Sequence, residues 1–151
     1  MSSSPRVYSA QHVVAYDYRR SVGPVLGRFF SELRERRIVG NRTANGRVLC
    51  PPMEHDPETS AATAPGFVEL GPGGAVTTWS WVPRPRAKHP LARPFAWALI
   101  RLDGADTALL HAVDAGSESR MRSGMRVCPR WRAETRGEIG DIECFEPEAS
   151  A

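Results

Sequence analysis

Five short strand-like segments follow one another in the second half of this 151-residue chain, with no helical pattern between them. They are rich in β-branched, aromatic and aliphatic residues, and turn residues such as the Asp-Gly pair at 103–104 separate them. Short strands at this spacing favour a small β-barrel, and a set of five favours an OB-fold. The segments are residues 75–82, 95–102, 107–113, 126–131 and 138–145.

The pattern inside these segments predicts how each one is buried. Segment 95–102 is apolar on both faces, which is typical of a central strand, and Pro129 makes segment 126–131 an edge or a bulged strand. Segment 75–82 alternates, so successive residues should lie on opposite faces. We expect Thr77, Trp79 and Trp81 on one face, and Val76, Thr78, Ser80 and Val82 on the other.

An amphipathic helix is predicted upstream of the barrel, from Ser21 to before Gly40. Ser21 can cap it, and Pro24 suits its first turn. The helix precedes the main body, so its apolar stripe can serve either the core or a partner protein, and the spacing alone leaves both open. The stripe consists of Val25, Leu26, Phe29, Phe30 and Leu33.

The stretch RTANGRVLCPPMEHDPET at 42–59 has the layout of a zinc ribbon, in which two pairs of positions flank a short hairpin. Zinc in such a site needs four soft or borderline ligands in a tetrahedron. Arg42 cannot ligate zinc, Asn45 and Thr59 are poor ligands, and only Asp56 is plausible. We therefore predict a degenerate ribbon that keeps its shape and holds no metal.

These patterns divide the chain into three segments. Residues 1–20 are a polar arm, residues 21–65 hold the helix and the ribbon-like hairpin, and residues 66–147 form the OB-fold domain. The predicted fold class is mainly β: a five-stranded OB-fold barrel preceded by an amphipathic helix and a metal-free ribbon-like hairpin.

Composition narrows the class of protein without fixing its function. Hydrophobic residues make up 41% and charged residues 25%, as in a globular chain, and the net charge of +3 permits an anionic partner without requiring one. No apolar run approaches the roughly 18 residues of a membrane span, and the N-terminus lacks the layout of a secretory signal, so we predict a cytoplasmic protein. The cysteines, Cys50, Cys128 and Cys144, are odd in number and widely spaced, which favours buried structural thiols.

A catalytic constellation is missing from the sequence. The four histidines, His12, His55, His89 and His111, form no HxxxH or HExxH motif, and the glycine-rich turn at 71–74 lacks the lysine of a phosphate loop. An enzyme needs several such groups together, so the sequence predicts a protein that is not itself an enzyme.

The order of these pieces resembles a known family. GRFFSELRERRIVG leads into NGRVLCPP, then TTWSWV, then PFAWALIRLDGADTALLHAV, SGMRV and finally CFEP. This order is similar to that of the OB-fold family with an N-terminal rubredoxin-like zinc ribbon, which is associated with acyl-CoA metabolism. Its members accompany sterol-carrier-protein-type thiolases, and some are parts of steroid side-chain aldolases. In this chain, NG at 45–46 and DPET at 56–59 stand where the family carries its zinc ligands.

The resemblance implies a non-catalytic partner subunit of a thiolase-like acyl-CoA enzyme. It implies no cofactor of its own, a coenzyme A thioester as substrate of the complex, and catalytic residues on the partner. The proline-rich loop at 83–94 could offer its cations, Arg84, Arg86, Lys88 and Arg93, to coenzyme A phosphates, or it could be solvated. The expected partner interface consists of Phe29, Phe30, Leu33, Val48 and Leu49.

A nucleic-acid-binding module is the alternative. OB-folds bind single strands by stacking bases on aromatic side chains above a basic groove. The basic loop and four tryptophans could supply such a surface, although tryptophans on alternating strands are usually core residues. The tryptophans are Trp79, Trp81, Trp97 and Trp131.

Overall fold

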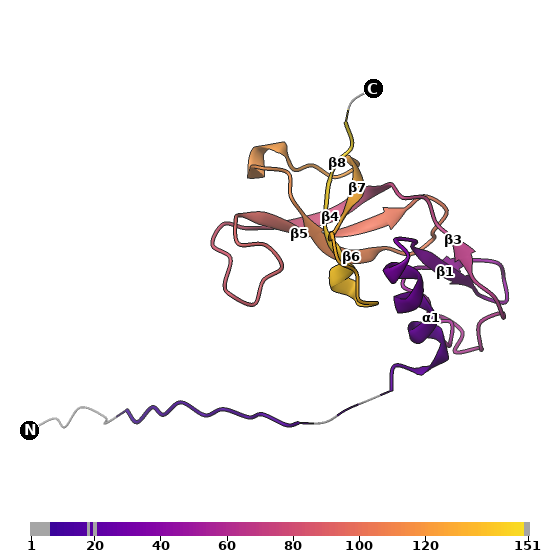
Figure 1. The fold of residues 1–151 in the computed structure, drawn as a ribbon, viewed down its shortest axis with the longest axis horizontal. Coiled ribbons are helices and arrows are strands. Elements are labelled where there is room, and N and C mark those ends of the chain that lie inside the picture. Colours follow the sequence, from indigo (N-terminus) through magenta and orange to yellow (C-terminus); the bar gives the residue numbers. More distant parts are fainter. Residues whose placement is uncertain (1–6, 18, 20, 150–151) are drawn as a thin grey trace, which may run out of the picture.

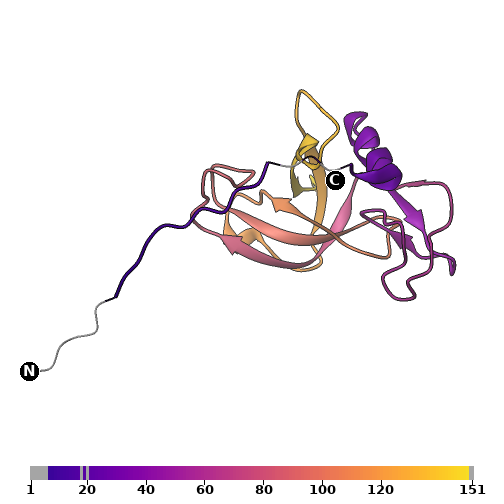
Figure 2. The ribbon, with the colours of Figure 1, turned by 90° about the horizontal axis from the view of Figure 1, so that it is seen from below.

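The computed structural model describes residues 7–17, 19 and 21–149. A small barrel forms one end of the folded body, and a helix with a small sheet forms the other (Figure 1). An extended segment before the helix runs beyond the body in both views (Figures 1 and 2). Among the described residues, no helix has the length and apolar character needed to cross a bilayer.

The N-terminal helix, α1 (Gly23–Arg34), lies where the sequence predicts it and ends before Gly40. Pro24 lies in its first turn, and the Ser21 hydroxyl accepts a hydrogen bond from the Gly23 N–H (3.3 Å). At its other end, Arg36 takes a left-handed conformation (φ 58°), which stops the helix before Gly40.

The ribbon-like segment forms a three-stranded antiparallel sheet in the order β2-β1-β3. Gly40 is required in β1 because a Cβ atom there would lie 2.5 Å from the Leu49 carbonyl oxygen. β3 lies beyond the expected segment boundary at 65/66, so the ribbon sheet includes residues from both expected segments. The strands are β1 (Val39–Arg42), β2 (Val48–Leu49) and β3 (Val68–Glu69).

The remaining strands close into a five-stranded barrel in the order β4-β5-β6-β8-β7, which confirms the predicted fold class. All neighbours are antiparallel except β6 and β8. Two short 3-10 helices, η1 (Glu118–Arg120) and η2 (Ile139–Asp141), precede β7 and β8. The strands are β4 (Gly74–Val82), β5 (Phe95–Leu102), β6 (Leu109–Val113), β7 (Arg126–Trp131) and β8 (Ile142–Pro147).

A β-bulge between Val76 and Thr78 corrects the predicted faces of β4. An extra residue in one strand reverses the side-chain alternation beyond it. Val76 is therefore buried on the same side as Trp79 and Trp81, which pack against the core. Each of these tryptophans lies opposite a small residue of β5, so large and small side chains alternate across the pair. The register is Trp79 with Ala98 and Trp81 with Ala96.

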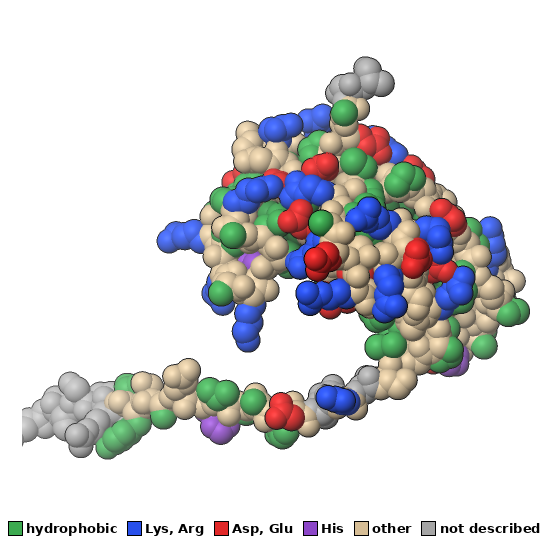
Figure 3. All heavy atoms as spheres, viewed as in Figure 1, with side chains coloured by type: hydrophobic (Ala, Val, Ile, Leu, Met, Phe, Trp, Pro, Cys, Tyr) green, Lys and Arg blue, Asp and Glu red, His purple; other side chains and the backbone are tan. Residues whose placement is uncertain are grey.

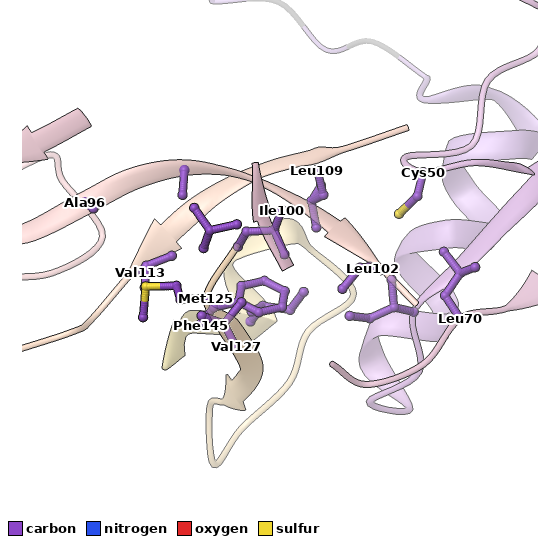
Figure 4. Close-up of a cluster of buried hydrophobic side chains, with 14 of the residues drawn as sticks. Cys50, Leu70, Ala96, Ile100, Leu102, Leu109, Val113, Met125, Val127 and Phe145 are labelled. Atoms are coloured by element: carbon purple, nitrogen blue, oxygen red, sulfur yellow. The ribbon is translucent and has the colours of Figure 1, made fainter. Parts of the chain in front are cut away.

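One hydrophobic core runs through the helix, the ribbon and the barrel. It includes Leu33 of α1. It also joins Cys50 beside β2 to Ile100 and Phe145 inside the barrel (Figure 4). The two ends of the body are thus one packed unit. Cys144 is buried as well and Cys128 is half-buried, and none of the three cysteines forms a disulfide. Burial raises the pKa of the Cys50 and Cys144 thiols to about 12, so both are protonated at neutral pH.

Candidate functional site

The proline-rich loop between β4 and β5 (residues 83–94) lies partly against the outer wall of the barrel. Leu91 is buried in a small cluster with Phe95, Ala112 and Cys144. The His89 ring meets the Phe95 ring edge-on, with 5.6 Å between the centroids. These contacts fix the second half of the loop, so it is not simply a solvated connection.

Arg93 anchors this half of the loop and is not a free cation. Its guanidinium pairs with Asp114 (Nε to Oδ2, 3.1 Å), whose side chain is buried. Arg130 reaches the same oxygen at 3.2 Å and also binds Glu143 and Glu146. The hydrogen bond from Arg93 is the main cause that holds the pKa of Asp114 below its ordinary value. Arg93 therefore holds the loop to the barrel, and its guanidinium is not available to bind a ligand.

The tip of the loop carries three exposed cations, Arg84, Arg86 and Lys88. In the described part of the chain, no ion pair involves any of them. A local turn shapes the tip, because the Arg86 N–H donates to His89 Nδ1 (3.1 Å) and the His89 N–H donates to the Arg86 carbonyl (2.9 Å). Basic side chains project from this edge of the barrel (Figure 3). We call Arg84, Arg86 and Lys88 the basic tip.

Each of the four ribbon positions is engaged by its own loop. Arg42 donates to the Gly46 carbonyl (3.3 Å), and Asn45 Oδ1 accepts a hydrogen bond from a neighbouring threonine hydroxyl. Asp56 Oδ1 accepts from the Glu58 N–H (2.9 Å), and the Thr59 hydroxyl accepts from a backbone N–H two residues on. Local hydrogen bonds thus occupy the side chains at the positions where a zinc ribbon has ligands.

We predict that the purified protein contains no stoichiometric zinc. Within the described residues, no group of three or more His, Cys, Asp or Glu side chains could hold a metal ion. Elemental analysis after dialysis against a metal-free buffer is the measurement. One zinc per chain would contradict the prediction.

A buried amide holds the two halves of the ribbon together. Asn41 is 2% exposed, and its side-chain NH2 donates to the Met53 carbonyl (2.7 Å) and to the Thr63 hydroxyl (2.9 Å). Its side-chain oxygen accepts from the Met53 N–H (3.1 Å). These three bonds connect β1 to the segments that a metal would otherwise join. We call this group the Asn41 clasp.

The ribbon is also fixed to the barrel through the turn between β5 and β6. Asp106 accepts from the Val48 N–H (2.7 Å) through its carboxylate and donates its own N–H to the Val48 carbonyl (2.8 Å). The Thr107 hydroxyl accepts from the Cys50 N–H (2.8 Å) and donates to the Cys50 carbonyl (3.0 Å). Strand β2 therefore has a second partner outside its own sheet.

The expected partner interface needs correction. Four of its five residues are buried by the chain itself, and all of these except Leu49 belong to the core between α1, the ribbon and the barrel. Only Phe30 is partly exposed, and it too packs against that core. Side chains with no exposed surface cannot form the contact face of a partner. The four are Phe29, Leu33, Val48 and Leu49.

The four tryptophans and His111 are engaged in packing. Trp79, Trp81 and Trp131 pack against the main core, and Trp97 lies edge-on to Phe95. The nucleic-acid hypothesis thereby loses free stacking surface. His111 is 6% exposed, and burial holds its pKa below the ordinary value, so it is a neutral strand residue.

Sequence reasoning missed three acidic or amide side chains that organise the molecule: Asn41, Asp114 and Asp141. Asp141 accepts three backbone N–H bonds, from Arg136, Gly137 and Glu138. None of the three belongs to a motif. The available signal was a polar residue inside or beside an apolar strand, as in RIVGNR for Asn41 and GDIECF for Asp141.

The barrel is similar to a domain of a known family. Residues 67–132 match the model of the ChsH2 C-terminal OB-fold domain, a stretch that includes β4 to β7. The matched stretch is similar to that domain and covers less than half of the chain. The last strand of the barrel, β8, lies outside the matched residues.

Solved structures share the fold over most of the chain. A chain of the Ltp2–ChsH2(DUF35) aldolase is similar with a TM-score of 0.62 at 20% identity, covering 87% of this chain and 100% of that one. A DUF35-family protein of unknown function from Sulfolobus solfataricus is similar with a TM-score of 0.60 at 19% identity, covering 83% of each chain. No curated protein matches the chain. At these identities, the structural likenesses show the fold alone.

Proposed function

We propose that this protein is a non-catalytic partner subunit of a thiolase-like acyl-CoA enzyme, of the steroid side-chain aldolase or thiolase type. The observation that carries the proposal is the match of residues 67–132 to the ChsH2 C-terminal OB-fold domain, within a barrel that is joined to a helix and a ribbon. The fold likeness to a chain of the Ltp2–ChsH2(DUF35) aldolase extends over the whole of that chain, beyond the barrel alone. This chain would bind the enzyme and complete its substrate site.

The division of labour follows from the side chains present. In the described residues, no group of three or more His, Cys, Asp or Glu side chains could hold a metal ion, the acidic side chains around Arg130 are paired with it, and the buried Cys50 and Cys144 thiols are protonated. General acid–base or nucleophilic catalysis needs such groups within hydrogen-bond reach of one another. We therefore assign the reacting groups to the partner and a binding role to this chain.

The basic tip is the part of this chain that suits a coenzyme A thioester. Coenzyme A carries several phosphate charges, and exposed Arg and Lys side chains bind phosphate by charge-assisted hydrogen bonds. Arg84, Arg86 and Lys88 form no ion pair with a carboxylate of the described chain, whereas Arg93 is held by Asp114. Three of the four cations that the sequence suggests for coenzyme A phosphates, those of the basic tip, are thus available to bind a ligand.

Co-expression with a candidate thiolase-like subunit tests the proposal. The two chains should co-purify as a hetero-oligomer, and turnover of acyl-CoA substrates should require the partner. Two results would overturn the proposal: turnover by this chain alone, or a partner that neither binds it nor changes activity in its presence.

Reversing the charge of the basic tip should raise the KM of the complex for acyl-CoA about tenfold and leave kcat unchanged. The triple variant is Arg84→Glu/Arg86→Glu/Lys88→Glu. The effect falls on KM because these groups hold ground state and transition state alike. Each exposed contact contributes about 1 kcal/mol or less, so three changes are needed. Steady-state kinetics with long-chain acyl-CoA is the measurement.

A matched variant controls for net charge. It reverses three exposed arginines outside the loop and should leave KM unchanged. An equal rise in KM in both variants would assign the effect to overall charge. A tip variant that instead abolished salt-dependent binding of a labelled oligonucleotide would favour the nucleic-acid alternative. The control is Arg101→Glu/Arg122→Glu/Arg132→Glu.

A further inference from the structure

The barrel closes between β6 and β8 through very little backbone pairing. Within the described chain, these two parallel strands pair only at Val113 and Phe145, where the Asp114 N–H also donates to the Phe145 carbonyl (2.8 Å). On its other side, β6 pairs with β5 along its whole length. Residues 109–112 of β6 therefore lack a strand partner on the β8 side. We call the stretch between residues 109–112 and the start of β8 the seam.

The imidazole of His111 lies in the seam and is buried there. Its Nδ1 accepts a hydrogen bond from the Ala112 N–H (2.9 Å), and its Nε2 lies 3.5 Å from the Ile139 carbonyl oxygen of η2, beside β6 (Figure 1). Its ring meets the Phe145 ring of β8 edge-on, with 5.5 Å between the centroids. One side chain thus joins β6 to η2 and β8 where the backbone pairing stops.

Only one protonation state of His111 can make both polar contacts. Nδ1 accepts from the Ala112 N–H only while it carries no proton, so the hydrogen-bond partners assign the ring proton to Nε2, which donates to the Ile139 carbonyl. In the imidazolium both ring nitrogens are donors. A proton on Nδ1 would therefore turn two donors toward each other in a buried place, and the Ala112 N–H would lose its acceptor.

The surroundings of His111 do not offset a positive charge. The charged side chains of the elements packed against it are either exposed or already bonded, and within the described residues none of them bonds to the imidazole. Burial therefore prevails and holds the pKa of His111 below the ordinary value of 6.5. The exposed side chains are Arg101 of β5 and Glu138 of η2, and those already bonded are Asp141 of η2 and Glu143 and Glu146 of β8.

We propose that His111 is a proton-sensitive switch: the neutral imidazole closes the seam between β6 and β8, and the imidazolium opens it. The inference goes beyond the proposed function and does not depend on it, because it concerns the chain by itself. Opening releases η2 and the loop before it. That loop supports the end of α1, since the Thr135 hydroxyl donates to the Arg34 carbonyl (2.8 Å). Acid therefore loosens the barrel and the support of α1 together.

The direction of the pH dependence follows from the two states of the seam. In the open seam, His111 has its ordinary pKa, and in the closed seam its pKa is lower. The stabilisation of the closed seam is therefore complete above the ordinary value and is lost as pH falls from there through the lower value. Between the two values, the open population rises by up to about tenfold for each pH unit.

Amide hydrogen exchange of the full-length chain, followed by NMR, tests the switch. The protection factor of the Ala112 N–H, corrected for the intrinsic exchange rate at each pH, should fall at least about threefold from about pH 7 to about pH 5. The Val76 N–H is the internal control, because it joins β4 to the segment before β7 through the Met125 carbonyl (3.0 Å), where the described chain has no histidine. Its protection should not change over this range.

Two variants complete the test. His111→Gln removes the titrating group, so its Ala112 protection should be the same at both pH values. His55→Gln removes an exposed histidine and should respond to acid as the wild type does. An equal loss of protection at Ala112 and Val76 would indicate global unfolding and overturn the inference, and so would an acid response that persists in His111→Gln. The wild type alone also decides the matter, because a His111 imidazole that titrates at or above the ordinary pKa in its NMR spectra would exclude the switch.

Discussion

Replacing Asn41 by alanine should lower the free energy of unfolding by about 2–3 kcal/mol. The substitution breaks the three hydrogen bonds of the Asn41 clasp and leaves the Met53 N–H without its acceptor inside the ribbon. The Met53 carbonyl keeps a bond from the Thr63 hydroxyl (2.9 Å), which limits the loss. For a chain of this size the melting temperature should fall by about 4–10 °C. Urea denaturation followed by circular dichroism measures the effect.

Asn45→Ala is the matched control, because Asn45 is an exposed asparagine in the same hairpin. Its loss should cost about 0.5 kcal/mol or less, as is usual for surface positions. If the two variants lost equal stability, the clasp would not be the element that holds the ribbon. The comparison thus separates a buried amide from an ordinary turn residue.

Replacing Asp141 by alanine should cost about 3 kcal/mol, the largest effect expected here. Its carboxylate is 1% exposed and accepts from the N–H groups of Arg136 (2.8 Å), Gly137 (2.7 Å) and Glu138 (3.1 Å). Removing the carboxylate leaves these three N–H donors without an acceptor, and hydrogen bonds to a charged acceptor are among the strongest in proteins. The same loop accepts the C-terminal end of α1, because Arg34 donates to the Arg136 carbonyl (3.0 Å). The contact between α1 and this loop should therefore weaken when Asp141 is replaced.

Glu134→Ala controls for a carboxylate in the same loop, since Glu134 is exposed. It should change stability by about 0.5 kcal/mol or less. Chemical denaturation together with proteolysis of the α1 region gives the readout. An Asp141→Ala variant as stable as the Glu134 control would contradict the assigned role.

The contribution of Asp141 should also depend on pH in a defined direction. Burial by itself would raise the pKa of the carboxyl, but its three N–H bonds together outweigh burial and hold the pKa below the ordinary value of 3.8. A folded-state pKa below the unfolded one stabilises the protein above the unfolded value, and that stability is lost as pH falls through the folded value. The stability difference between the wild type and Asp141→Asn should stay constant from pH 7 to about pH 5 and shrink below about pH 4. A difference that grew in acid would contradict this origin.

Hydrophobic periodicity and turn residues are enough to predict the helix, the five barrel strands and the ribbon-like hairpin from the sequence. They do not reveal the β4 bulge, since a single extra residue leaves the alternation of AVTTWSWV intact in the sequence. The faces of Trp79 and Trp81 were therefore predicted wrongly relative to Val76. Local composition decides whether a segment forms a strand, whereas its register is set by pairing with the neighbouring strand.

The candidate site could be predicted only in part, for a related reason. Arg84, Arg86 and Lys88 are exposed as a basic loop suggests, but Arg93 is paired with a residue 21 positions away. The Asn41 clasp and the bonds from Asp106 and Thr107 to the ribbon also join distant segments. Long-range polar pairs leave no periodic trace, so only the folded chain reveals them.

The barrel keeps the basic tip and the ribbon apart. β4 begins beside the ribbon and ends where the basic loop starts, and nine strand residues span about 30 Å (Figure 1). Sites this far apart, with no shared partners, respond to substitution almost additively. The tip can therefore diversify through random change without loosening α1 and the ribbon, which lie at the other end (Figure 1). Related chains could in this way acquire new ligand preferences while keeping one mode of assembly, and a laboratory library confined to the loop should leave assembly intact.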